Sequence, residues 1–304
     1  MSYQISVKFS KIIAMAAVVL LVAQAQAISP KALGQGIPSL APMLEQVTPA
    51  VVSIRVSKAV RTSGRGSEQM GRPYATGAGS GVIVDAASGL IITNHHVVAG
   101  ASRITVRLVD ERALEATLLG SDPGTDVALL QVEAQDLIEI AFADVSTVAV
   151  GDYVVAIGNP FGIGQTVTSG IVSALGRAGI NNENYEDFIQ TDAAINLGNS
   201  GGALVDMEGN LIGINTAIIS GSGGSNGIGF AVPTDMVMSV MEHLKRDGEV
   251  RRGLLGVAIA DATLDIVAAL EVDVDHGAVV TSVMPDSAAE KAGVQLSDVI
   301  VEID

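Results

Sequence analysis

A serine between glycines forms the motif that best suits nucleophilic chemistry in this sequence. Ser200 stands in the stretch Gly198-Asn199-Ser200-Gly201-Gly202, and the apolar residues 203–205 follow it. Glycines permit tight turns and let a ligand approach the backbone closely. A serine hydroxyl is a weak nucleophile until a base takes its proton. The motif is therefore either a turn between strands or part of a catalytic group, and a histidine with an orienting carboxylate would decide between them.

Four histidines could supply that base. His243 falls on the polar side of a predicted helix and His276 lies in an acidic turn, so we interpret both as solvated. His95 and His96 come just after the apolar segment 90–93, where a strand would deliver them to its end. Because adjacent side chains point in different directions, only one of this pair can face Ser200.

Asp126 is the best candidate for the orienting carboxylate. It directly precedes the apolar run 127–130, and a carboxylate at the mouth of a buried strand can be held dry and fixed. Asp122 precedes a proline and is typical of a turn, and we interpret Asp192 as a loop-stabilising carboxylate. The chain order histidine, aspartate, serine is that of chymotrypsin-like enzymes and differs from the α/β-hydrolase and subtilisin orders.

Short strands must position these residues. They are predicted at residues 50–56, 81–84, 90–93, 103–109, 113–119, 127–132, 153–158, 167–173, 203–205, 211–217 and 228–232. Many short strands separated by Gly, Asp and Asn turns indicate a sandwich or barrel. The strands after residue 80 form two groups on either side of Ser146, so we expect an all-β fold of two barrels with a cleft between them. One helix follows Pro233, with Thr234 as its N-cap and Gly248 as its end.

The amino-acid composition disfavours several classes of function. The chain has 304 residues, 48% of them hydrophobic and 16% charged, which suffices for one large domain and a small one. Its net charge of -16 disfavours nucleic acid or an anionic membrane as a partner. Cysteine is absent, which excludes disulfides and thiolate chemistry. We expect no metal and no cofactor.

The N-terminus is typical of a secretory signal. Lys8 and Lys11 precede the apolar run 12–22, which is followed by Ala25-Gln26-Ala27, and a basic segment, a short apolar segment and a small-residue cleavage site define such signals. We expect residues 1–27 to be cleaved, residues 28–45 to be a flexible lead-in and the mature protein to be periplasmic. The alternative is an uncleaved inner-membrane anchor facing the periplasm.

Three blocks of the sequence resemble the catalytic segments of the HtrA/Deg family. They are residues 93–98 (TNHHVV), 125–130 (TDVALL) and 191–204 (TDAAINLGNSGGAL), and further matches lie at 79–83, 157–162, 213–218 and 227–233. The resemblance runs from about Pro42 to the C-terminus. It implies a chymotrypsin-like double β-barrel over residues 46–248 and a PDZ domain over residues 249–304. The implied function is a periplasmic serine endopeptidase of protein quality control, assembled from trimers.

The resemblance also implies roles for individual residues. In the family's T-N-x-H-V block the histidine three positions after the threonine is catalytic, which assigns His96 and leaves His95 as the variable position. Ser200 would attack the scissile carbonyl, His96 would carry the proton and Asp126 would orient His96. The oxyanion hole would be formed by the N–H groups of Gly198 and Ser200, with Asn199 between them.

The same resemblance implies how substrate binds. An added substrate strand would pair with the backbone of Ile214, Asn215, Thr216, Ala217 and Ile218. The loop 220–227 would help to shape the pocket for a small aliphatic P1 side chain. Asn199 carries no charge and cannot form the ion pair by which a new N-terminus activates trypsin-like zymogens. We therefore expect control by ordering of loops 159–165 and 177–187.

The C-terminal region resembles the start of a PDZ domain. Its carboxylate-binding loop and first strand would include Leu254, Leu255, Gly256 and Val257. Because the sequence stops at Asp304, before the helix that would form one wall of the peptide groove, we expect a partial PDZ domain. Capture of a C-terminal peptide is therefore left open. Two other functions are also left open for the chain: a chaperone-like binding protein on the same scaffold and an unrelated esterase.

Overall fold

The computed structural model describes residues 39–59, 74–159, 164–180, 185–196, 198–218, 225–274 and 276–302. The predicted signal peptide, and residues 28–38 of the predicted lead-in, lie outside the described residues. The chain divides into two compact units, one ending at Gly248 and one beginning at Glu249. Each unit is described by itself below.

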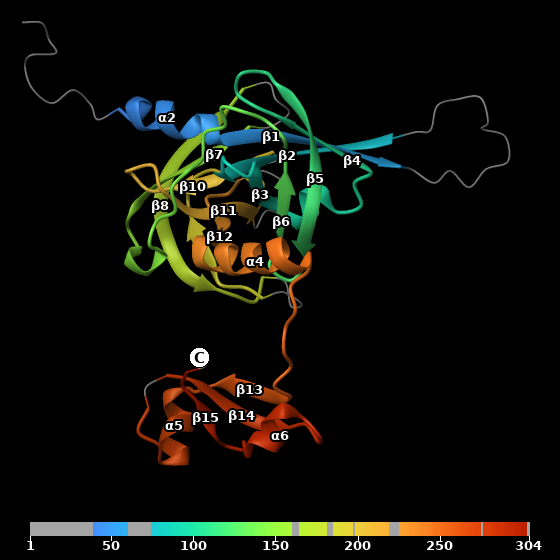
Figure 1. Ribbon diagram of the computed structural model, residues 1–304. Coiled ribbons are helices and arrows are strands. Elements are labelled where there is room, and N and C mark those ends of the chain that lie inside the picture. Colours follow the sequence, from blue (N-terminus) through green and yellow to red (C-terminus); the bar gives the residue numbers. More distant parts are fainter. Residues whose placement is uncertain are drawn as a thin grey trace, which may run out of the picture. The chain divides into compact units, whose positions relative to one another are not determined.

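The first barrel closes six antiparallel strands in the order β1-β2-β3-β6-β5-β4 (Figure 1). Alternating apolar side chains such as Val52, Ile54 and Val56 on the first strand point into its core, as the period of two in a strand requires. Its strands are β1 (Val51–Ala59), β2 (Tyr74–Asp85), β3 (Leu90–Asn94), β4 (Arg103–Arg107), β5 (Ala113–Asp122) and β6 (Val127–Gln131).

The second barrel closes in the order β10-β11-β12-β9-β8-β7. Its core contains Val154, Ile189, Ile195 and Leu204. The two closed barrels confirm the predicted fold class, although β9 was not predicted from the sequence. The strands are β7 (Tyr153–Gly158), β8 (Thr166–Arg177), β9 (Phe188–Thr191), β10 (Ala203–Val205), β11 (Leu211–Ile218) and β12 (Gly229–Pro233).

Helix α4 (Thr234–Asp247) packs on strands of both barrels, namely β5, β6, β11 and β12 (Figure 1). It ends at Gly248, whose φ of 73° is left-handed, as predicted. The prediction that Thr234 caps the helix is wrong. Strand β12 runs through Pro233, which takes the N-cap position, and Thr234 is the first helical residue with no capping hydrogen bond.

Shorter helical segments complete the first unit. Helix α2 (Ala41–Val47) is followed by the 3-10 turn η3 (Thr48–Ala50). The prediction of a flexible lead-in as far as residue 45 is therefore wrong from Ala41 onward, because Val47 and Ala50 are buried and anchor the segment. The others are α3 (His95–Val98) and η4 (Val145–Thr147). No helix within the described ranges is long and apolar enough to cross a membrane.

The second unit is a three-stranded antiparallel sheet with two helices. The sheet order is β13-β14-β15. Helix α6 confirms the predicted capped helix, because the Ser287 hydroxyl accepts a hydrogen bond from the N–H of Glu290 and Gly293 ends the helix in the left-handed region. The elements are β13 (Val257–Asp261), α5 (Leu264–Leu270), β14 (Ala278–Val283), α6 (Ala288–Ala292) and β15 (Val299–Ile300).

Candidate active site

His96 and Asp126 meet where two neighbouring strands of the first barrel end and begin. Strand β3 pairs with β6 so that Asn94 lies opposite Val127. The chain turns into α3 at His95 just beyond this pair, and Asp126 directly precedes β6. The Nδ1 of His96 lies 2.7 Å from Oδ2 of Asp126, and the backbone N–H of His96 donates to Oδ1 at 2.9 Å. This bidentate contact fixes the imidazole with its Nε2 directed away from the carboxylate.

Hydrogen bonds stabilise the turn that carries Asp126 on both sides. Asp126 has a φ of 57°, a left-handed conformation that aspartate tolerates better than most residues. Its carbonyl accepts hydrogen bonds from the N–H of His95 and the side-chain amide of Asn94, both at 3.0 Å. Before it, the Asp122 carboxylate accepts from the N–H and hydroxyl of Thr125, which confirms the predicted turn role of Asp122.

Thr216 on β11 joins the second barrel to this pair. Its hydroxyl donates to Oδ2 of Asp126, and its backbone carbonyl accepts a hydrogen bond of 3.2 Å from Oγ of Ser200. The sequence placed Thr216 on the substrate-binding strand and gave no sign of a contact with Asp126. That contact depends on the packing of the two barrels. Hydrogen bonds therefore link Ser200 to the Thr216 carbonyl, the Thr216 hydroxyl to Asp126, and Asp126 to His96.

The ionisation of Asp126 follows from these partners. Burial raises the pKa of its carboxyl, but hydrogen bonding and charge interaction with His96, together with the hydroxyl of Thr216, outweigh it and lower the pKa below the ordinary value of 3.8. A side chain that is 18% exposed is thus kept ionised at neutral pH. A carboxylate in this state can stabilise a protonated imidazole.

This lowered pKa predicts how stability depends on pH. Because the folded-state pKa of Asp126 is depressed, its contribution to the free energy of unfolding is present above pH 3.8 and is lost as the pH falls through the folded value. Urea unfolding of the parent and of Asp126→Asn across the acid range measures this, and the variant should lose less stability on acidification. Equal pH dependence of the two proteins would contradict the assignment.

The backbone of residues 198–202 presents free donors beside Ser200. Gly198 and Gly201 have φ values of 99° and 82°. A Cβ at position 201 would collide with the carbonyl oxygen of Ser80 and the hydroxyl of Thr93, so glycine is required there on two grounds. Among the described residues, the N–H groups of Gly198 and Ser200 have no hydrogen-bond acceptor. Two unpaired donors on either side of Asn199 are the arrangement that an oxyanion hole needs.

The hydroxyl of Ser200 is engaged by Thr216 instead of His96. Within the described ranges no hydrogen bond joins Oγ of Ser200 to the His96 ring, and the His96 side chain is half exposed. Catalytic hydrogen bonds are often long or absent without substrate and tighten on binding.

Asn199 is buried beside Ser200, with 1% of its surface exposed. Its side-chain oxygen lies against Gly158, where a Cβ would collide with it. Its amide Nδ2 has no hydrogen-bond partner in the described part of the chain. A neutral amide in this dry position is compatible with the expectation that no ion pair forms here.

The residues of the expected substrate strand differ in their availability. Ile214 pairs with Ala203 on one side and with Val232 on the other, and the N–H and carbonyl of Asn215 bond to Gly202 and Gly201. Beyond Asn215, the pairing of β11 within the described residues is with β12 alone, at Ala217 and Ile218. The edge open to a partner strand is therefore Thr216 to Ile218.

The other titratable residues singled out in the sequence lie away from this site. His95 is half-buried, and its Nδ1 lies 2.9 Å from the Ser121 hydroxyl. The Asp192 carboxylate accepts from the N–H of Ile171, which confirms its loop-stabilising role. The prediction that His243 is solvated is wrong, because α4 packs on both barrels and leaves Nδ1 of His243 buried without a partner in the described residues. His276 is exposed.

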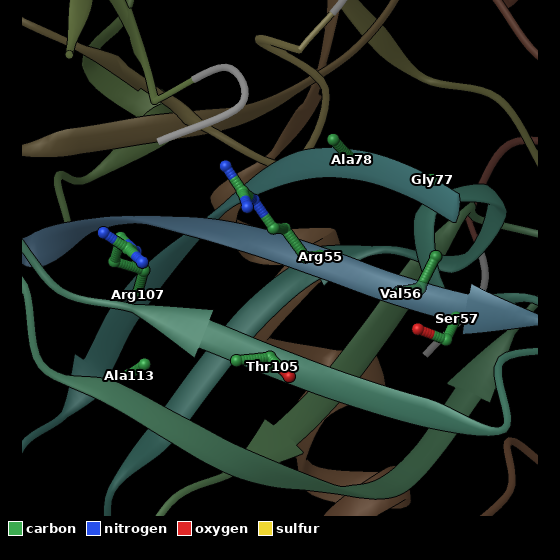
Figure 2. A pocket seen from close by; sticks show the side chains of 8 residues that line it. All are labelled: Arg55, Val56, Ser57, Gly77, Ala78, Thr105, Arg107 and Ala113. Atoms are coloured by element: carbon green, nitrogen blue, oxygen red, sulfur yellow. The ribbon is translucent and has the colours of Figure 1, made fainter. Parts of the chain in front are cut away.

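A hollow of about 430 Å³ on the outside of the first barrel is lined by none of the candidate active-site residues. Figure 2 shows the side chains of Arg55 on β1 and Arg107 on β4 within it. Arg107 pairs with Glu111. No cluster of His, Cys, Asp or Glu that could hold a metal ion occurs in the described ranges.

Similarity to solved structures and to curated proteins shows the family of this chain. The HtrA-type protease AlgW with tripeptide superposes with a TM-score of 0.75 at 46% identity, and the match covers 88% of this chain and 83% of that one. The chain belongs to the HtrA/Deg family of serine proteases. Within this HtrA/Deg chain, residues 79–214 match the trypsin-like peptidase domain and residues 243–304 match the PDZ domain.

Curated relatives of this HtrA/Deg chain are named as periplasmic. The periplasmic pH-dependent serine endoprotease DegQ of Escherichia coli K12 is 49% identical over 283 residues, and the match covers 88% of this chain and 61% of DegQ. The periplasmic serine endoprotease DegP of Salmonella typhimurium LT2 is 48% identical over 304 residues, with 88% and 64% covered. The chain thus spans just under two thirds of the length of these relatives.

Proposed function

We propose that this protein is a serine endopeptidase that cleaves unfolded or misfolded polypeptides in the periplasm. One observation carries the proposal. The Asp126 carboxylate holds His96, and Thr216 links this pair to Ser200 through two separate groups, its hydroxyl and its backbone carbonyl. The relatives named as periplasmic serine endoproteases support both the activity and the location. Cleavage of the N-terminal signal and assembly into homotrimers or multiples of them are part of the proposal.

The reaction proceeds by acyl transfer. His96 takes the proton of the Ser200 hydroxyl through Nε2 as Oγ attacks the scissile carbonyl carbon, and Asp126 stabilises the imidazolium. The N–H groups of Gly198 and Ser200 bind the oxygen on which negative charge develops, a contribution of several kcal/mol. His96 then gives the proton to the leaving amine as the C–N bond breaks. Water, deprotonated by His96, hydrolyses the acyl-enzyme and restores Ser200.

Substrate binding prepares the nucleophile. A polypeptide that adds as a strand along Thr216 to Ile218 donates a backbone N–H to the Thr216 carbonyl, which is the acceptor that the Ser200 hydroxyl uses now. Once the substrate takes this acceptor, the hydroxyl turns to His96. Recognition of an extended backbone suits unfolded chains, because a folded protein offers few such segments.

A small aliphatic P1 residue, namely alanine, valine or isoleucine, is part of the proposal, as the family resemblance implies. The loop 220–227 that would complete the pocket, and the proposed regulatory loops 159–165 and 177–187, lie partly outside the described residues.

The second unit offers an edge to a C-terminal peptide. Within the described part of the chain β13 pairs only with β14, so its other edge can take an added strand. The carboxylate would lie on the backbone of residues 254–257. The carbonyls of Leu255 and Gly256 are bonded to Ala289 and Met284, which holds this loop in place.

Gly256 provides a test of the peptide site. It has a φ of 82°, and a Cβ there would collide with the side chain of Ser287, so Gly256→Ala should displace the loop. In the Ser200→Ala background, which prevents cleavage, a fluorescent peptide with a free apolar C-terminus should bind, and Gly256→Ala should weaken binding at least about tenfold. The same peptide with an amidated C-terminus is the control. Equal binding of the amidated peptide would show that the loop captures no carboxylate.

Incubation with unfolded casein, beside Ser200→Ala, tests the proposed function. Cleavage by the parent that the variant lacks supports an endopeptidase. Equal inactivity with suppressed aggregation in both proteins would identify a chaperone-like binding protein instead. Reaction of Ser200 with a fluorophosphonate and turnover of esters, without turnover of peptides, would identify an esterase.

A further inference from the structure

Ser80 connects the first barrel to the backbone around the nucleophile through three hydrogen bonds. It lies on β2 and is fully buried. Its hydroxyl donates to the Gly198 carbonyl at 2.6 Å and accepts from the N–H of Asn159 at 2.7 Å. Its backbone N–H donates to the Ser200 carbonyl at 2.8 Å. The sequence matched this segment to the family blocks but gave Ser80 no role.

These contacts hold the two residues whose N–H groups are free. The Gly198 carbonyl is fixed by the Ser80 hydroxyl, and the Ser200 carbonyl by the Ser80 N–H. Between them, the N–H of Asn199 is turned inward onto the Asn196 carbonyl at 3.0 Å. Each anchored carbonyl fixes the peptide plane that follows its residue, so a change in backbone angles that reorients the free N–H of Gly198 or Ser200 and also moves this plane would break a buried hydrogen bond. Such a break is costly because the freed groups have no water to bond.

Ser80 also reaches the segment that carries the base. Its carbonyl accepts the Thr93 hydroxyl at 2.7 Å, and Thr93 is the next-to-last residue of β3 before His95. One residue therefore ties the strand that ends at the histidines to the loop that carries the nucleophile. The backbone bonds can form with any residue at position 80, whereas the bridge from Gly198 to Asn159 needs a hydroxyl that donates and accepts at once.

We propose that Ser80 is a positioning residue for the oxyanion hole, acting through the Gly198 carbonyl. It touches no reacting atom, so its loss should affect the transition state and leave ground-state binding of substrate unchanged. The inference rests on the proposed function, because it concerns the efficiency of the same acyl-transfer step. Removal of one oxyanion donor lowers kcat by about 100- to 1000-fold in serine proteases. Loosening the Gly198 donor through Ser80→Ala, which leaves the backbone bond to Ser200 in place, should lower kcat by about 10- to 100-fold.

Ser53 supplies a matched control. It lies directly opposite Ser80 in the pairing of β1 with β2, it is equally buried, and its hydroxyl has no hydrogen-bond partner in the described part of the chain. Ser53→Ala removes the same group from the same sheet without touching Gly198. A general effect of an altered barrel core would appear in both variants, and loss of positioning would appear only in Ser80→Ala.

The experiment measures kcat and KM on a peptide substrate and the inhibition constant of a peptidyl boronate, whose tetrahedral adduct places an oxygen in the oxyanion hole. For Ser80→Ala we expect kcat to fall and the boronate constant to rise by similar factors, with KM changed less than about twofold. Ser53→Ala should match the parent, and Ser80→Thr, which restores a hydroxyl, should recover most of kcat. Circular dichroism and thermal unfolding report the folding of each variant.

Several outcomes would overturn the inference. They are a Ser80→Ala kcat within about twofold of the parent, equal losses in Ser53→Ala, or a rise in KM alone. If Ser80→Ala does not fold, Ser80→Cys keeps the volume with a weaker donor, and full activity in that variant would contradict the role. A parent protein that neither cleaves peptide nor binds the boronate would refute the proposed function itself. An active parent whose kcat does not change on substitution of Ser80 would refute only the role of Ser80.

Discussion

Ser200→Ala should lower kcat for peptide hydrolysis by about a million-fold, to the floor set by contaminating proteases. The variant keeps the strand edge at Thr216 and the N–H donors of Gly198 and Ser200, so it should still bind substrate. It lacks the only oxygen that can form the acyl-enzyme. Initial rates on a quenched fluorescent peptide measure the change.

Ser169→Ala is the control for that substitution. Ser169 is exposed on β8 and is bonded to none of the residues assigned to the site. It should leave kcat and KM unchanged. If Ser200→Ala retained more than about a hundredth of the parent rate while Ser169→Ala behaved normally, another group would be the nucleophile.

Asp126→Asn should lower kcat at neutral pH by about ten thousand-fold. An asparagine can occupy the same space, but its amide would donate to Nδ1 of His96. The imidazole would then carry its proton on Nε2, where it cannot accept one from Ser200. The negative charge that stabilises the imidazolium would also be lost. Steady-state kinetics together with the NMR signal of the His96 ring proton would reveal both effects.

Asp144→Asn provides the comparison for that variant. Asp144 is an exposed carboxylate that accepts hydrogen bonds from the N–H and hydroxyl of Ser146, in a turn outside the active-site group. It loses the same charge from the same unit and should keep the parent kcat. A similar loss in both variants would mean that net charge, and not the orientation of His96, governs the rate.

Much of the fold followed from local patterns in the sequence. Alternating apolar residues and glycine turns were sufficient to place eleven of the twelve barrel strands approximately and to divide them between two barrels. Strand β9 has four residues, Phe188–Thr191, which is too short to show alternation. Strand β1 extends beyond the predicted range to Ala59 because β2 pairs along its whole length. The start of α4 at Thr234 was set by the preceding strand and not by capping chemistry.

The candidate catalytic residues could be predicted because each lies in a short, recognisable segment of the sequence. The order of His96, Asp126 and Ser200 along a β-rich chain was informative without any knowledge of distances. The contacts of Thr216 with Asp126 and of Ser80 with Gly198 were not predictable, because each joins residues 90 or 118 positions apart across the two barrels. The availability of the substrate strand also depended on tertiary pairing, since Ile214 is held on both sides by β10 and β12.

The most direct test of the account is the site at which a fluorophosphonate labels the native protein, determined by mass spectrometry of its peptides. A nucleophile activated by His96 should take one label per chain, on Ser200. Labelling should be lost in His96→Ala, in which the base is absent but the hydroxyl remains. A label on another residue, or undiminished labelling of Ser200 in His96→Ala, would contradict the assignment of Ser200, His96 and Asp126 as a catalytic group.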